Sequence, residues 1–144
     1  MNVRIQAASR LHISGLARLC GELGYPLKEA EILRNLLQVN RNKDSLVLVA
    51  LSQSEVVGWI QVSRIWRLES GVFAEIVGLV VQEDFRGQGI GTRLVEQARR
   101  WGLRKRCARL RVRCNLTRRA AHQFYRQAGF TESKRQMILD LPLK

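Results

Sequence analysis

Cysteine and histidine are scarce in this sequence, and the few that occur are not arranged as metal ligands or disulfide partners. The three cysteines, Cys20, Cys107 and Cys114, are an odd number and include no Cys-x-x-Cys pair. Paired cysteines at short, regular spacing are the usual sign of a structural zinc site or a disulfide framework. The composition therefore predicts no metal site, and we expect the cysteines to be buried thiols.

Long apolar runs are also absent. Nowhere do eighteen apolar residues follow one another, so the sequence predicts no membrane-spanning helix. A secretory leader has a basic start followed by an apolar stretch. The first residues, Met-Asn-Val-Arg-Ile-Gln, do not show this pattern. We expect a cytoplasmic protein that has no membrane partner.

Acidic residues are few relative to basic ones, since 12 Asp and Glu stand against 25 Lys and Arg, a formal net charge of +13. Such a balance is compatible with a nucleic-acid-binding surface. The known RNA and DNA modules nevertheless leave motifs that are missing here: an aromatic pair on a ribonucleoprotein-type strand, a Gly-x-x-Gly clamp and zinc-ligand spacing. We expect no specific nucleic-acid partner, although a non-catalytic nucleotide- or RNA-binding module stays open as an alternative.

The sequence does contain one alternating series of helix and strand patterns. Its 144 residues, 46% of them hydrophobic, suffice for one core, and we predict a single domain over residues 1–144. Early hairpins and a late crossover predict a mixed α/β fold, with about seven strands in a central mixed sheet flanked by about four helices. The periodicity predicts strands over 3–8, 45–51, 56–65, 72–82, 107–114, 130–134 and 136–141, and helices from 9 or 14 to about 23 and over 28–39, 88–105 and about 116–128.

The most informative segment covers residues 79–92, where an apolar strand ends in a glycine-rich loop that leads into a helix. Gly87, Gly89 and Gly91 leave the backbone amides clear of side chains, so successive N–H groups can approach an anionic oxygen. The helix that follows directs its unpaired N–H groups and the positive end of its dipole at the same space. The segment therefore predicts a phosphate-binding loop.

The glycine spacing decides which phosphate ligand fits. A dinucleotide fingerprint places its third glycine one residue later, and a P-loop needs a lysine that is missing here. The spacing that is present is Arg-x-x-Gly-x-Gly, formed by Arg86, Gly89 and Gly91. This pattern resembles the acetyl-coenzyme A pyrophosphate loop of the GCN5-related N-acetyltransferase (GNAT) family. A glycine-rich turn without a ligand is the alternative interpretation of the loop taken alone.

The resemblance continues beyond the loop. The segment 107–114 alternates apolar and basic residues as a strand would, and a short helical pattern follows it up to Gly129, a residue suited to ending a helix. An Asn at the strand end, here Asn115, and a Phe-Tyr pair ahead of Gly-Phe, here Phe124 and Tyr125, are features of the family. The order of elements is similar over nearly the whole chain, whereas specific motifs lie only within residues 75–130.

The resemblance implies that acetyl-CoA is the co-substrate. It implies that the main chain of the strand over 79–81 holds the pantetheine arm and polarises the thioester carbonyl, and that basic side chains reach the phosphates. The implied cofactor-binding residues are Leu79, Val80, Val81, Arg86, Gly87, Gln88, Gly89, Ile90, Gly91, Thr92, Asn115, Arg118, Ala121 and Phe124.

Acetyl transfer to an amine needs a base for the ammonium proton and an acid for the departing thiolate. Tyr125 is the candidate acid and matches the tyrosine that many family members place beside the sulfur; a tyrosine that merely packs on its helix is the alternative. Glu75, four residues before Leu79, is the candidate base, because other members of the family carry a glutamate there; an exposed glutamate at the end of a strand is the alternative. No nucleophile motif is recognisable, so we expect direct transfer within a ternary complex.

The acceptor is the least determined part of the prediction. The short chain and the segment around Arg119 to Tyr125 look similar to acetyltransferases of small amines, so we expect a small primary amine. A lysine side chain or amino terminus of a protein or peptide is the alternative acceptor. The oligomeric state is left open between a monomer and a homodimer.

Overall fold

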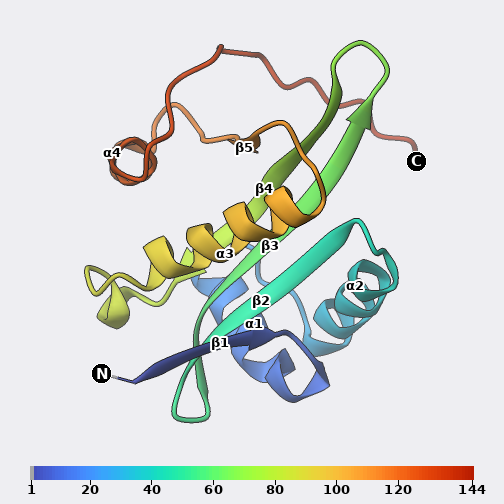
Figure 1. Ribbon diagram of the computed structural model, residues 1–144. Coiled ribbons are helices and arrows are strands. Elements are labelled where there is room, and N and C mark those ends of the chain that lie inside the picture. The colour runs from blue at the N-terminus through green and yellow to red at the C-terminus, as the bar shows by residue number, and fades with distance from the viewer. Residues whose placement is uncertain (1) are drawn as a thin grey trace. The chain divides into compact units, whose positions relative to one another are not determined.

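The computed structural model describes residues 2–144 and divides them into two compact units (Figure 1). The first unit comprises the residues up to Arg113, and the second comprises Cys114–Lys144. Each unit is described by itself below. None of the helices formed by residues 2–144 combines the length and the apolar character that a bilayer crossing requires.

The first unit is built on a five-stranded sheet. Its strands follow their order in the chain, and the first four pair antiparallel, whereas the last pair is parallel. A parallel pair requires a crossover connection, which a helix provides here. The strands are β1 (Val3–Ala7), β2 (Ser45–Ser52), β3 (Glu55–Arg67), β4 (Gly71–Val81) and β5 (Leu110–Val112).

Three helices of the first unit pack on this sheet, and a fourth helix belongs to the second unit. The α-helices are α1 (Ile13–Glu22), α2 (Glu29–Arg41), α3 (Ile90–Arg104) and α4 (Arg119–Gln127). Two short 3-10 turns, η1 (Arg10–His12) and η2 (Glu83–Phe85), precede α1 and α3. Ser9 caps the first of these turns, since its hydroxyl accepts a hydrogen bond from the Leu11 N–H at 3.3 Å.

The core of the first unit lies on both faces of the sheet. Apolar side chains of α1 and α2 pack with alternate residues of β2, whose intervening residues point to the other face. On that other face lies α3, because a Cβ added to Gly58 of β3 would lie 3.5 Å from both Ile90 and Leu94. The cluster under α1 and α2 consists of Ala8, Ile13, Leu16, Leu19, Ile32, Leu36, Val47, Val49, Leu51, Val56 and Val80.

Strand β4 is interrupted by a bulge just before its predicted cofactor-binding end. Gln61 of β3 faces Gly78 and Val62 faces Ile76, so Val77 is an extra residue on β4. Only glycine fits after the bulge, because a Cβ on Gly78 would lie 2.6 Å from the ring of Trp59. On its other side β4 pairs with β5 only at residues 74–76, so within the described chain no strand partner flanks residues 77–81 there.

The sequence predicted the fold class but not the number of strands. A mixed sheet with four α-helices is confirmed, whereas the described residues form five strands and not about seven. The predicted strands over 130–134 and 136–141 are wrong, because residues 130–144 form neither helix nor strand. The predicted strand over 107–114 is shorter, Leu110–Val112. The apolar side chains of the last segment are therefore exposed, namely Met137, Ile138, Leu139, Leu141 and Leu143.

Candidate active site

The predicted phosphate-binding loop follows β4 and has the backbone that its glycines suggest. Gly87 has a φ of 76° and Gly89 a φ of 83°, a left-handed conformation that side-chain-bearing residues rarely adopt. A Cβ added at either position would meet no atom within 4 Å. The space above both glycines is therefore open, as the approach of a pyrophosphate to backbone N–H groups requires.

The amino terminus of α3 completes this loop. Gly89 is the N-cap residue and supplies no side-chain hydrogen bond, and the first turn contains no acidic residue. The positive end of the helix dipole is thus not neutralised by the helix itself, which favours an anion there. Gly91 and Thr92 lie in the first turn of α3, within the helix that was predicted over 88–105. Ile90 is 2% exposed and packs in the core, which leaves only its main chain for a ligand.

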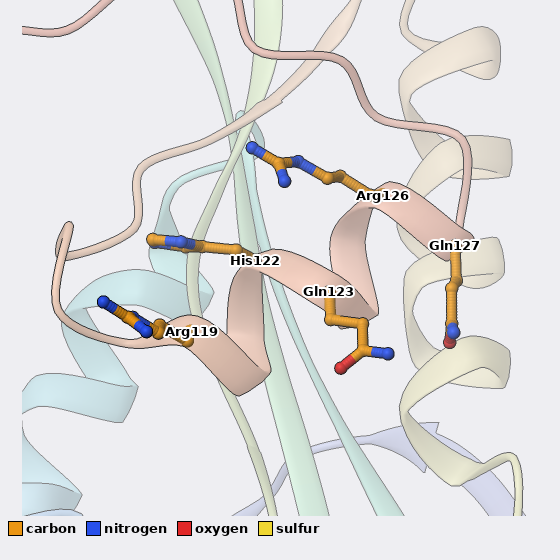
Figure 2. Close-up of a pocket in the computed structure, with 5 residues that line it drawn as sticks. All are labelled: Arg119, His122, Gln123, Arg126 and Gln127. Carbon is orange, nitrogen blue, oxygen red and sulfur yellow. The ribbon is translucent and has the colours of Figure 1, made fainter.

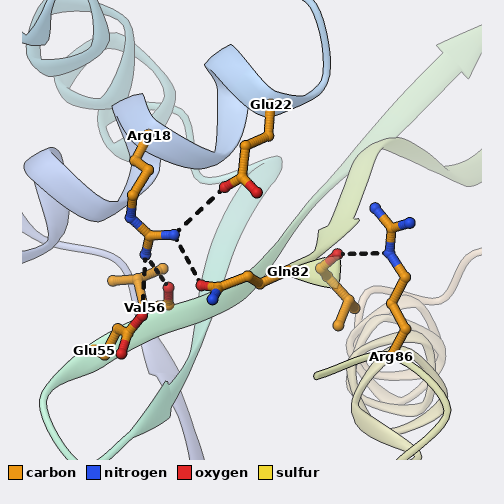
Figure 3. A network of polar contacts seen from close by, with 7 residues as sticks. Arg18, Glu22, Glu55, Val56, Gln82 and Arg86 are labelled. Atoms are coloured by element: carbon orange, nitrogen blue, oxygen red, sulfur yellow. Dashed lines mark hydrogen bonds and ion pairs between the residues drawn. The ribbon is translucent and has the colours of Figure 1, made fainter. Parts of the chain in front are cut away.

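Arg86 is held against the end of β4 by its own side chain. Its Nε donates a hydrogen bond to the Val81 carbonyl at 3.0 Å, and its guanidinium is exposed (Figure 3). A planar guanidinium fixed at Nε presents its remaining donors as a fork, the arrangement that suits a phosphate oxygen pair. Gln88, the other predicted polar ligand of the loop, donates from Nε2 to the Asp84 carbonyl at 3.5 Å.

The end of β4 is also anchored to α1 through Arg18. The guanidinium of Arg18 donates to Gln82 Oε1 at 2.8 Å and to the Val56 carbonyl at 2.7 Å, and it forms ion pairs with Glu22 and Glu55 (Figure 3). Gln82 is the last residue before η2. Arg18 therefore fixes the point from which the loop departs, a role that no local sequence pattern indicates.

The predicted pantetheine strand offers its main chain rather than its side chains. Val80 is 6% exposed and belongs to the core cluster, and Leu79 and Val81 are half-buried. Because β5 does not extend alongside these residues, their outward main-chain groups have no strand partner on that side within the described chain. This is the arrangement by which an extended ligand can add to a sheet edge.

Glu75, the candidate base, lies on β4 and forms an ion pair that sequence reasoning missed. Arg113 donates from Nε to Glu75 Oε1 at 2.9 Å, and the glutamate side chain is 16% exposed. A Cβ on Gly102 of α3 would lie 3.4 Å from the Cβ of Ala74, so Ala74 points toward α3 and its neighbour Glu75 points to the opposite face. The carboxylate is thus largely buried and oriented by an arginine.

Tyr125, the candidate acid, lies in the second unit between two aromatic rings. Its ring meets those of Phe124 and Phe130 edge to face, with centroids 5.0 and 5.4 Å away. The pKa of Tyr125 is raised to about 12, mainly by burial and in addition by Cys114, while Arg118 opposes the shift. The hydroxyl therefore stays protonated throughout the neutral range and can donate a hydrogen bond there.

The junction before α4 is shaped by Asn115. Its Oδ1 accepts hydrogen bonds from the Thr117 N–H at 3.0 Å and from the Thr117 hydroxyl at 2.8 Å, while its carbonyl accepts from the Arg118 N–H at 3.0 Å. Such a turn fixes where α4 begins. Arg118 and Ala121, which were predicted with it as cofactor contacts, lie at the start of this helix. Asn115 thus has a structural function of its own within the second unit.

A cavity of about 640 Å³ opens on α4. This cavity was not predicted from the sequence. It is lined by Arg119, His122, Gln123, Arg126 and Gln127 (Figure 2). The three basic side chains project from one side of the helix, as residues spaced by three and four do. His122 Nε2 lies 2.8 Å from the Asn115 carbonyl. The helical spacing of these polar residues was the signal that could have indicated this surface.

The cysteines take no part in a metal site within residues 2–144, where no group of three or more His, Cys, Asp or Glu side chains could hold a metal ion. All three thiols are free and half-buried rather than fully buried as expected. Burial raises the pKa of each, so they are poor nucleophiles at neutral pH.

The comparison with family models identifies one family, and the relatives of known function are acetyltransferases. Residues 13–130 match the model of the acetyltransferase (GNAT) family. An aminoalkylphosphonate N-acetyltransferase of Salmonella typhimurium is 32% identical over 116 residues, which cover 80% of this chain and 73% of that protein. The streptothricin acetyltransferase of Escherichia coli is 29% identical over 90 residues, covering 62% of this chain, and the match spans about half of that relative, 49% of its length.

The fold is shared with solved structures of more distant sequence. An aminoglycoside N-acetyltransferase solved with a coenzyme A-based bisubstrate analogue has a TM-score of 0.88 to this chain at 16% identity, with 99% of each chain covered. At that identity the likeness concerns the fold.

Proposed function

This chain belongs to the acetyltransferase (GNAT) family and is an acetyl-CoA-dependent acyltransferase, and from that premise we propose that it acetylates the primary amine of a small molecule by direct transfer. The observation that carries the proposal is the loop of residues 86–89 at the uncapped start of α3. Bound acetyl-CoA supplies an activated acetyl thioester. The residues described below do the rest of the chemistry.

The loop and β4 fit this co-substrate. The open space above Gly87 and Gly89 and the first N–H groups of α3 suit a pyrophosphate, and the exposed guanidinium of Arg86 adds four further N–H donors. The main chain over 79–81, without a partner from β5, suits an extended amide-containing arm. An N–H group from that segment would stabilise the oxyanion that develops on the thioester carbonyl.

Glu75 is proposed to accept the proton of the acceptor ammonium. A carboxylate has about four lone-pair sites, so it can accept the hydrogen bond from Arg113 and still receive a proton. The ion pair fixes the orientation of the carboxylate, because an arginine bound through Nε leaves it little freedom to rotate. The acceptor needs such a base, because its amine is an ammonium in solution and an ammonium has no lone pair with which to attack the thioester.

Tyr125 is proposed to donate a hydrogen bond to the departing sulfur. Its pKa of about 12 lies some 3.5 units above the reference value near 8.5 for a thiol. Complete proton transfer to the thiolate would therefore be uphill by roughly 5 kcal/mol at 1.36 kcal/mol per unit. Tyr125 thus stabilises the thiolate by a hydrogen bond, and the thiolate takes its proton from water once it is released.

The acceptor is proposed to be a small amine that also carries an anionic group. The net charge of +13 repels lysine-rich peptides and polyamines and attracts anionic or zwitterionic molecules. One relative is an aminoalkylphosphonate N-acetyltransferase, whose named substrate has this character. A peptide acceptor remains an outcome of the test.

The test compares kcat/KM for aminoalkylphosphonates, aminoglycosides, polyamines, and lysine-bearing or amino-terminal peptides at one salt concentration. We expect the aminoalkylphosphonate to be preferred. A tenfold preference for a peptide would refute the proposal of a small-molecule acceptor. A preference for a polyamine or an aminoglycoside would refute the proposal that the acceptor carries an anionic group.

The two proposed catalytic groups are tested separately. Tyr125→Phe keeps both ring contacts and removes only the hydroxyl, so kcat should fall by roughly 100-fold while the dissociation constant for acetyl-CoA is kept. Glu75→Gln keeps the shape of the side chain but removes the base. The value of kcat/KM for the amine should fall, and the acidic limb of the rate–pH profile should change. Wild-type turnover in each variant would remove these assignments while leaving the family unchanged.

A further inference from the structure

Three arginine side chains converge on one buried aromatic ring in the first unit. The guanidinium carbons of Arg111, Arg67 and Arg109 lie 4.7, 5.3 and 5.8 Å from the ring centroid of Phe73, which is completely buried. Each distance is within the range of a cation–π contact. The ring therefore holds three positive charges in one small patch, which we call the Phe73 arginine patch.

The protein balances the positive charge of this patch only in part. Arg67 lies 4.0 Å from Glu69, at the limit of an ion pair, and that glutamate is strongly exposed. Neither Arg109 nor Arg111 has a carboxylate within ion-pair distance in the described part of the chain. Like charges at this spacing repel one another, and an anion that accepts hydrogen bonds from two of them would remove the repulsion.

The patch lies beside the proposed base. Glu75 and Arg111 are directly opposite each other in the parallel register of β4 and β5, so both side chains point to the face away from α3. Phe73 is two residues from Glu75 on the same strand and shares that face, at a spacing of about 7 Å. An acceptor with a few atoms between its amine and its anionic group spans such a distance.

We propose that Arg109 and Arg111 bind the anionic group of the acceptor, a phosphonate or phosphate, while Glu75 takes the proton from its amine. The inference rests on the proposed function and adds the residues that select the substrate class. Guanidinium groups suit this task because their paired N–H donors match two oxygens of a tetrahedral oxyanion. Stacking on Phe73 holds them in place, so less side-chain freedom is lost when the anion binds.

The activity test uses two acceptors that share an amine and differ in the anion, 2-aminoethylphosphonate and ethylamine. We expect the wild-type kcat/KM to favour the phosphonate at least tenfold, and Arg111→Gln and Arg109→Gln each to reduce that ratio by tenfold or more, mainly through KM. Arg104→Gln is the matched control, because this exposed arginine ends α3 and is not one of the arginines that stack on Phe73. An equal loss on both acceptors would show a merely structural role and overturn the proposal.

A second measurement needs no turnover. Methylphosphonate, a phosphonate without an amine, should raise the melting temperature of the cofactor-free wild type and of Gly89→Ala, but not of the Arg109→Gln/Arg111→Gln variant. A shift that persists in the double arginine variant would overturn the proposal, as would tighter binding of a short RNA than of methylphosphonate to the same arginines. If the wild type acetylates neither acceptor, the proposed function is refuted. The methylphosphonate measurement then still tests whether Arg109 and Arg111 bind an anion.

Discussion

Replacing Gly89 by alanine should separate the function of the loop from its contribution to stability. Gly89 has a φ of 83°, and an added methyl group would meet no atom of the protein within 4 Å. The variant therefore costs only the strain of a left-handed alanine, about 1–2 kcal/mol. Gly71 provides a matched control, because it has a φ of 81° and equally open surroundings but lies at the start of β4.

The two variants should differ only in their affinity for acetyl-CoA. Both should lower the melting temperature by a few degrees, roughly 2–4 °C per kcal/mol for a chain of this size. In Gly89→Ala the methyl group stands where a phosphate must approach the backbone N–H groups. A hydrogen bond to a charged group contributes about 1.5–3 kcal/mol, and losing one weakens binding at least tenfold.

The assay is calorimetric titration of each folded variant with acetyl-CoA. Gly71→Ala should bind as the wild type does, whereas Gly89→Ala should have a dissociation constant at least tenfold higher. Equal dissociation constants in the two variants would show that the phosphates lie elsewhere, and would refute the assignment of the loop. Unequal melting temperatures would refute the claim that their backbone strain is the same.

Two further predictions concern single side chains. In a Tyr25→Phe background the phenolate absorbance of Tyr125 should appear with a midpoint near pH 12. The contribution of Tyr125 to the free energy of unfolding, measured against Tyr125→Phe in the same background, should be constant below pH about 10 and fall between pH about 10 and about 12, because the unfolded tyrosine ionises first. Gly15→Ala should lower the free energy of unfolding by about 1–3 kcal/mol, since its Cβ would lie 2.6 Å from the Cβ of Val56. Gly21→Ala on the same helix meets no atom within 4 Å and should raise it by up to about 1 kcal/mol, as measured by urea unfolding.

Local patterns in the sequence were sufficient for the part of the site that is contiguous in the chain. The loop and α3 follow from glycine positions and from helical periodicity, and both signals extend over only a few residues. The left-handed conformations of Gly87 and Gly89 are the physical reason why that pattern is informative. The same holds for Gly129, whose φ of 103° ends α4 as predicted.

Features that depend on distant partners could not be predicted. The ion pair of Glu75 joins residues 38 positions apart, and alternation along β5 showed only that Arg113 would point away from the core. The bulge at Val77 lies in a run that is apolar on both faces, so no change of period marks it.

The carboxy-terminal segment shows the limit of periodicity most directly. Met137, Leu139 and Leu141 alternate as strand residues do, yet they form no ladder and are exposed. Alternation indicates which side chains would share a face, but a strand exists only if a neighbouring strand pairs with it.

The anchoring of the loop at both ends has a consequence for protein engineering. Gln82 is held by Arg18 through its side chain, and its N–H donates to the Val57 carbonyl at 2.8 Å, while Ile90 is fixed in the core at the other end. Small changes in loop length cost little closure entropy, about 0.6 kcal/mol for each doubling. A library that varies residues 83–88 between these fixed ends should therefore consist mostly of folded proteins, and the affinity for the phosphates of the co-substrate can be varied in it without rebuilding the fold.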